Sequence, residues 1–142
     1  MSQHDRPFSG AAFRSVRLLL LAWFSLLFFR LTLSGLGYNL SKRALRAEEE
    51  GVRPASPAFA RRTALAVNRA SRFVPRATCL VRAMAAKFLL DRKGYASSIC
   101  VGVAKEAGTP LKAHAWLKSG DLIVVGDEER QTARYAPFMK SV

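Results

Sequence analysis

The sequence predicts an α+β fold, with helices first and a small antiparallel sheet after them. Between residues 56 and 94 the apolar side chains recur at helical spacing, and capping residues stand at both ends of each segment. From residue 95 onward the spacing changes to an alternation of period two, with turn-forming residues between the segments. The chain has 142 residues, which is enough for one modest domain with its own core.

The N-terminal part of the chain is the most apolar. The run from Leu18 to Phe29 has arginine at each border and is interrupted only by Ser25. Twelve residues are fewer than the roughly 20 that a membrane-spanning helix needs, and a longer span would place Arg30 in the hydrocarbon. No clean signal-peptide cleavage site follows. We therefore expect a helix in residues 1–40 that the core or a partner covers, with membrane-surface contact as the second interpretation.

Two further helices are predicted from their caps. Ser56, followed by proline, is a favourable N-cap for a helix that runs to about Phe73. Thr78 is the N-cap predicted for the next helix, whose apolar stripe covers 80–89 and faces the core. Two cations and Gly94 then give a typical helix end. A short and weaker helix is expected after Ser41.

Three strands are expected in the C-terminal part, at about 95–106, 111–118 and 122–127, with a tight turn that contains Asp121 between the last two. In the first strand one face carries Ile99, Val101 and Val103, and the other carries Cys100, Gly102 and Ala104. The small face of this strand predicts that a helix packs closely against it.

Cys79 falls in the first turn of the helix that Thr78 opens. The unpaired N–H groups and the positive end of a helix stabilise a thiolate, which is the nucleophilic form of cysteine. The same N–H groups can receive the negative charge that develops on an attacked carbonyl oxygen. Cys79 is therefore a candidate nucleophile. Cys100, in mid-strand on a small face, is expected to be structural.

A nucleophilic thiolate needs a proton acceptor, which is usually histidine. His4 belongs to a polar terminal segment, which leaves His114, in mid-strand between two alanines. The base in turn needs an orienting acceptor, and Asp127 follows the neighbouring strand of the hairpin. Asp121 is the rival, although it lies in the turn, where aspartate has a structural role. Each residue taken singly has an ordinary structural explanation, but their order favours a Cys-His-Asp enzyme.

The net charge is +13, and residues 51–90 contain eight basic side chains and no acidic one. Such a surface attracts polyanions, anionic lipid or an acidic protein. No aromatic interleaving or arginine-glycine pattern indicates specific nucleic-acid binding, and a solvated basic face is the simplest explanation. The two cysteines are too few for a disulfide framework, so we expect a cytoplasmic protein, with membrane association as an open alternative.

The segments "TCLVRAMAAKFLLDRKG", "VGVAKE", "AHAW" and "RYAPF" resemble those of the stand-alone leader peptidase of lasso-peptide biosynthesis, within the transglutaminase-like cysteine proteases. The resemblance covers about residues 40–142 and is strongest from Thr78 to Trp116. It implies a papain-like unit with Cys79 as nucleophile, His114 as general base and then acid, and Asp127 as orienting residue, one position displaced from the family spacing. Lys118 stands where members often have an acidic residue.

The resemblance also implies the reaction and the partners. A ribosomally made precursor would be cut between leader and core through a thioester, without a metal ion or other cofactor. An ATP-dependent cyclase would then use the freed amine. Since residues 1–40 do not look like a precursor-recognition domain, a separate recognition protein is expected to present the leader. On this basis the chain divides into a segment 1–40 for partner or membrane-surface contact and a protease domain 41–142.

Two alternatives remain open. One is a transglutaminase-like acyltransferase, in which an amine and not water accepts the acyl group. The other is a non-enzymatic basic protein, either membrane-peripheral or a scaffold, in which Cys79 only packs.

Overall fold

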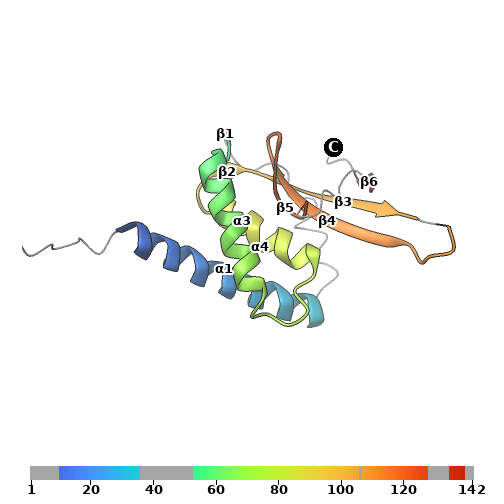
Figure 1. Ribbon diagram of the computed structural model, residues 1–142, viewed down its shortest axis with the longest axis horizontal. Helices are drawn as coiled ribbons and strands as arrows, with labels where there is room; N and C mark the ends of the chain where they lie inside the picture. The colour runs from blue at the N-terminus through green and yellow to red at the C-terminus, as the bar shows by residue number, and fades with distance from the viewer. Residues whose placement is uncertain (1–9, 36–52, 106, 128–134, 140–142) are drawn as a thin grey trace, which may run out of the picture.

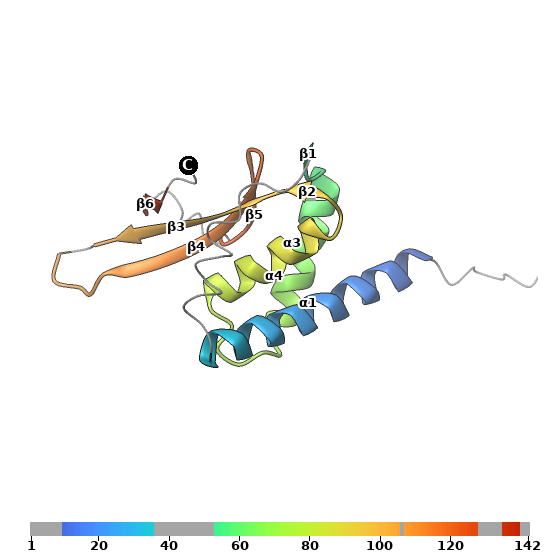
Figure 2. The same ribbon diagram turned by 180° about the vertical axis from the view of Figure 1, so that it is seen from behind.

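The helices and the sheet form three layers in a computed structural model that describes residues 10–35, 53–105, 107–127 and 135–139. The outer layer is α1 (Gly10–Gly35), the middle layer is α3 (Pro57–Ser71) with α4 (Cys79–Asp91), and the third layer is a sheet (Figure 1). Seen from both sides, α1 lies across α3 and α4 on the side away from the sheet (Figure 2). The predicted α+β class is confirmed.

The main sheet has four antiparallel strands in the order β5-β4-β3-β6. Its strands are β3 (Ser98–Ala104), β4 (Lys112–Ser119), β5 (Leu122–Val125) and β6 (Ala136–Met139). A separate parallel pair joins β1 (Arg53–Pro54) to β2 (Tyr95–Ala96). The three predicted strands are present, but β1 and β6 were not predicted. Each contains a proline, which lacks a backbone donor and is tolerated at a sheet edge, so neither segment has a strand-like sequence.

The caps of α3 and α4 are those that the sequence predicts. Ser56 Oγ accepts a hydrogen bond from the N–H of Phe59 at 3.3 Å, with proline at the next position. Thr78 Oγ1 accepts one from the N–H of Val81 at 3.4 Å. Gly94, with φ at +71°, ends the turn after α4, as glycine does without strain.

The middle helix α4 is buried on more sides than its predicted stripe, because α1 covers one side and the sheet covers the other. Ala83, Ala86 and Leu90 are fully buried although they lie outside the stripe. Phe88 was predicted to face the core but is 38% exposed and packs edge-to-face on Phe29 of α1. A single helical stripe cannot predict burial for a helix between two layers.

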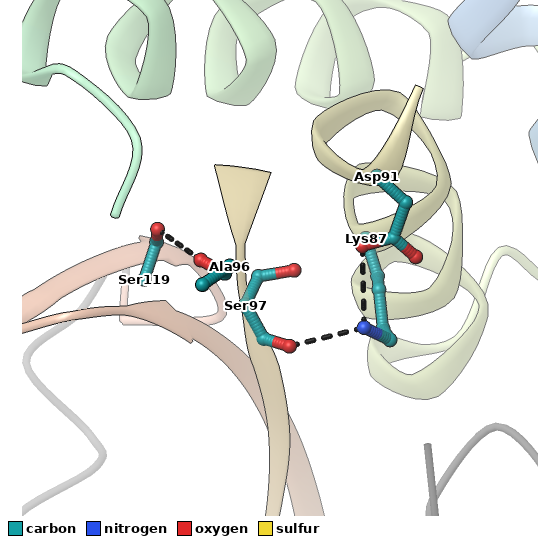
Figure 3. Close-up of polar contacts among 5 residues, drawn as sticks. All are labelled: Lys87, Asp91, Ala96, Ser97 and Ser119. Carbon is teal, nitrogen blue, oxygen red and sulfur yellow. Dashed lines mark hydrogen bonds and ion pairs between the residues drawn. The ribbon is translucent and has the colours of Figure 1, made fainter. Parts of the chain in front are cut away.

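Two buried side chains join neighbouring elements: Lys87 ties α4 to the segment between β2 and β3, and Ser119 ties β4 to the parallel pair (Figure 3). Lys87 Nζ donates to the carbonyl of Ser97 at 3.0 Å and forms an ion pair with Asp91 at 3.3 Å. Ser119 Oγ donates to the carbonyl of Ala96 at 2.5 Å and accepts from the N–H of Ala55 at 2.8 Å. These bonds satisfy backbone groups that would otherwise be buried without a partner.

The N-terminal helix is longer than its predicted apolar run, since it continues past both bordering arginines. By length and composition alone, the stretch Ala12–Thr32 is sufficient to cross a membrane, a test that core helices and signal sequences also pass. The sequence argument that the segment is too short is therefore wrong. One side of α1 packs on α3 and α4, with Ala22 and Leu26 fully buried, as expected for a helix that the core covers.

The predicted packing of a helix on the small face of β3 is wrong. Ile99 of the opposite face belongs to the core that the helices form, and Val101 packs against it. A Cβ at Gly102 would lie 2.7 Å from Cβ of Tyr135 and 2.9 Å from the indole of Trp116. Gly102 therefore makes room for the side chains of Trp116 and Tyr135 and not for a helix.

Three predictions fall on residues outside those described: the short helix after Ser41, the position of His4 and the course of the chain around residue 40. The division of the chain at residue 40 thus stays a prediction, although α1 shares one apolar core with α3 and α4.

Candidate active site

Cys79 is the first residue of α4, directly after the N-cap Thr78. The N–H groups of Val81 and Arg82 bind the side chain and the carbonyl of Thr78, at 3.4 and 3.0 Å. The first N–H groups of a helix, which here include those of Cys79 and Leu80, have no acceptor within the helix. The thiol is free and half-buried. It therefore lies where backbone donors can stabilise a thiolate or an oxyanion.

The start of α4 is tied to α3. Arg82, one turn after Cys79, donates from Nη2 to Oδ1 of Asn68 at 2.5 Å. Arg76, in the turn before the cap, has a left-handed backbone with φ at +58° and an exposed side chain. The Asn68–Arg82 bond holds the first turn of α4, and with it the sulfur, in a fixed place against the neighbouring helix.

His114 lies on β4 and is held by the end of the next strand. Its Nε2 lies 2.5 Å from the carbonyl oxygen of Gly126. Because a carbonyl only accepts, Nε2 must donate, and in the neutral ring Nδ1 then carries the lone pair. The imidazole also stacks on Trp116, with ring centroids 6.1 Å apart, and lies against Tyr135 at 5.2 Å. This arrangement leaves one ring nitrogen ready to accept a proton.

Gly126 approaches β4 more closely than any other residue type allows. Its φ is +100°, and an added Cβ would lie 2.6 Å from Cβ of Trp116 and 2.8 Å from the carbonyl oxygen of Ala115. The register pairs Leu117 with Val125, so the chain after Val125 runs back beside Trp116. Gly126 is therefore required where its carbonyl meets His114.

Asp127 follows Gly126 directly and is half-buried. The structure thus brings the segment that carries Asp127 alongside His114, as the hairpin predicts, but the acceptor on Nε2 is the carbonyl of Gly126. Asp121 lies in the turn between β4 and β5 and is exposed, in agreement with its predicted structural place. Gly126 and Tyr135 were missed as contacts of the imidazole. The glycine before Asp127 was an available signal, whereas no local pattern predicts the approach of Tyr135.

The structure does not bring Cys79 and His114 into contact. Successive side chains of a strand point to opposite faces, so His114 and Trp116 share one face of β4 while Ala115 and Leu117 share the other. Leu117 is fully buried in the core with the helices, so His114 is on the face away from α4. No hydrogen bond joins Cys79 to His114 within the described ranges. The assignment of the triad therefore stays a prediction.

Cys100 has a structural environment. It pairs with Trp116 across the strands and is half-buried. Burial raises the pKa of the Cys100 thiol, and this outweighs the opposing effects of the Lys118 cation and of a hydrogen bond with Ser98. Cys100 therefore stays a neutral thiol near pH 7, which disfavours a nucleophilic role.

In the part of the chain that the structure describes, no three side chains of histidine, cysteine, aspartate or glutamate gather closely enough to hold a metal ion. What the arrangement offers is a thiol at a helix start and an imidazole with a defined tautomer, the groups that acyl transfer to and from cysteine uses.

A family model of the transglutaminase-like superfamily matches residues 23–140. The match covers most of the chain, so the protein belongs to the transglutaminase-like superfamily. No curated protein and no solved structure matches the chain significantly. The match begins inside α1 and ends beyond β6, and it therefore includes both Cys79 and His114. This superfamily typically contains cysteine peptidases and acyltransferases.

Proposed function

We propose that the protein is a cysteine peptidase that removes the leader from a ribosomally made lasso-peptide precursor. The observation that carries the proposal is Cys79 at the capped start of α4, in a chain of the transglutaminase-like superfamily. The sequence "CLVRA" followed by "AHAW" supports the narrower assignment by its resemblance to the leader peptidases of that biosynthesis.

In the proposed reaction Cys79 Sγ attacks the carbonyl carbon between leader and core, and His114 takes the thiol proton. The N–H groups at the start of α4 bind the oxyanion. His114 gives its proton to the departing amine, which is the new N-terminus of the core. Water then attacks the thioester, with His114 accepting its proton, and the leader leaves as a carboxylic acid. Asp127 would orient the imidazole, in addition to the carbonyl of Gly126.

This reaction requires Sγ of Cys79 and the imidazole of His114 to meet. The hairpin of β3 and β4 extends past the end of the helical layer, and the start of β4 lies in this extended part (Figure 1). We propose that in the loaded enzyme this end of β4 twists, with the Gly126 carbonyl still on Nε2, so that the imidazole of His114 turns from the outer face of the sheet toward the start of α4. The leader, the recognition protein and the cyclase are the proposed partners.

The principal experiment is incubation of the full chain with a candidate precursor and a recognition protein, with the products identified by mass. We expect free leader and free core from the wild type, and no cleavage by Cys79→Ala or His114→Ala. The matched control is Cys100→Ala, which removes the other thiol and should still cleave. A product in which leader is joined to an added amine would indicate the acyltransferase instead, and a Cys79→Ala variant with full activity would end both proposals.

A second experiment tests the meeting of the two residues directly. A double variant that carries Cys100→Ser and His114→Cys is treated with an oxidant, with and without precursor. A disulfide to Cys79 forms only if the Cα atoms come within about 7 Å of one another. Loss of the mass of two hydrogen atoms would report it. Failure to cross-link under either condition, beside an active Cys100→Ser parent, would contradict the dyad.

A further inference from the structure

We propose that a groove along one flank of α1 binds an anionic phospholipid, so that the protein docks on a membrane surface with α1 lying in its plane. The proposal does not depend on the reaction at Cys79, because the groove is built by α1, α3 and the C-terminal end of α4.

From Phe13 to Leu31 the outward face of α1 carries a line of large apolar side chains. Six large side chains recur there at intervals of three or four residues and are between 52% and 72% exposed. They are Phe13, Val16, Leu20, Phe24, Phe28 and Leu31. A continuous apolar face of this size, not covered by other described residues, indicates an interaction surface.

A basic hollow of about 430 Å³ adjoins this face at the N-terminal half of α1. Five cations line it: Arg14, Arg17, Arg62, Arg92 and Lys93. None of the five forms an ion pair with another described residue. Among the residues of α1, α3 and α4 that the structure describes, Asp91 alone is acidic, and it is paired with Lys87. The hollow is therefore suited to a phosphate or another anionic headgroup.

An apolar hollow of about 350 Å³ continues the same flank. Phe24, Phe28 and Phe29 of α1 and Phe88 of α4 line it, and almost no polar surface is present. Leu21 lines both hollows, so the two are adjacent. A cationic pocket that leads into an aromatic one matches an anionic headgroup with an attached acyl chain. An acidic protein or a nucleic acid would use the cations but leave the phenylalanines exposed.

The packing of α1 favours docking in the plane over spanning. Its inner side chains Ala22, Ser25 and Leu26 are at most 5% exposed and face α3 and α4. Drawing α1 across a bilayer would remove this side from the core and expose the apolar faces of the other two helices to water. A helix that keeps its inner face packed and presents Phe24 and Leu20 outward is arranged as interfacial helices are.

The test uses the full chain and sedimentation with vesicles of phosphatidylcholine, either alone or with phosphatidylglycerol. We expect binding only with the anionic lipid, reversed by high salt. Arg14→Gln with Arg17→Gln should weaken the partition about thirtyfold, because two cations near the anionic surface are lost. Phe24→Ser with Phe28→Ser should weaken it similarly through the acyl-chain hollow.

Matched control variants distinguish binding at the groove from non-specific electrostatic or hydrophobic binding to vesicles. Lys105→Gln with Lys112→Gln removes the same charge at the far end of the β3–β4 hairpin, and Phe73→Ser removes another exposed phenylalanine, at 77% exposure. Both should bind as the wild type does, with unchanged thermal unfolding. The proposal would be overturned by equal binding to neutral vesicles or by equal losses in the control variants. It would also be overturned if the bound protein resisted extraction by alkaline carbonate, as a membrane-spanning helix does.

Discussion

At the scale of single residues, the imidazole of His114 owes its tautomer to a backbone carbonyl. Gly126 can place that carbonyl 2.5 Å from Nε2 because it has no Cβ and adopts φ at +100°. The sequence identified the histidine from its small neighbours, and it identified the following strand as the source of an acceptor. The choice between the carbonyl and the Asp127 carboxylate depends on backbone geometry that residue types do not specify.

Replacement of Gly126 by alanine should disturb both stability and the orientation of His114. The new Cβ would clash with the β4 backbone, and the positive φ adds strain of about 1 to 3 kcal/mol. The matched control is Gly108→Ala, which has a similar φ of +79° but open space around it. Chemical denaturation should show the larger loss for Gly126→Ala. Equal losses would mean that strain alone, and not the close approach, matters.

The two thiols should differ in reactivity near neutral pH. Burial raises the pKa of Cys100, so its thiolate fraction at pH 7 is lower than that of an ordinary cysteine. Cys79 is the first residue of α4, and its thiol lies beside the unpaired N–H groups of the first turn. Iodoacetamide should therefore modify Cys79 first, as read by peptide mass. At a pH high enough to ionise the Cys100 thiol as well, the difference between the two labelling rates should narrow. Preferential labelling of Cys100 would contradict this ordering.

At the scale of elements, the N-cap of α4 orders the turn that carries the Cys79 thiol. Both α3 and α4 begin with a hydroxyl cap. The stability that a cap contributes can therefore be separated from its effect on the neighbouring Cys79. The sequence identified both caps, because capping is a local interaction between residues three apart. It did not predict which sides of α4 are buried, since that depends on two other layers.

Removal of the cap by Thr78→Ala should cost about 1 kcal/mol of stability. Ser56→Ala removes the equivalent bond of α3 and should cost a similar amount. Only Thr78→Ala should slow the reaction of Cys79 with iodoacetamide, because only that cap orders the first turn beside the sulfur. Urea denaturation and labelling rates, compared for the pair, provide the measurement. The same decrease in labelling rate for both would point to a general loosening of the fold.

At the scale of the whole molecule, α1 is a structural layer as well as a surface. Leu26 is fully buried among α3 and α4, whereas Leu20, almost two turns earlier, is 52% exposed. The helix is apolar on both sides, so its composition alone predicted a covered helix or membrane-surface contact and could not say which side is covered. The packing distinguishes the inner side from the outer one.

Replacement of Leu26 by alanine should destabilise the fold by about 2 to 5 kcal/mol, as a cavity in the core does. The same change at Leu20 should alter stability by no more than about 0.5 kcal/mol. Thermal unfolding of the two variants, in the absence of lipid, is the measurement. Similar small effects at both positions would mean that α1 is not part of the folded core.

The sequence by itself determined the α+β class, the caps of α3 and α4, three of the strands and the position of Cys79 at a helix start. All of these depend on interactions within one element or one hairpin, which residue spacing records. Only the tertiary structure decided that α1 forms an outer layer, that rings fill the small face of β3, and that His114 points away from α4. These features depend on which faces meet, and a face is chosen by contacts between residues far apart in the chain.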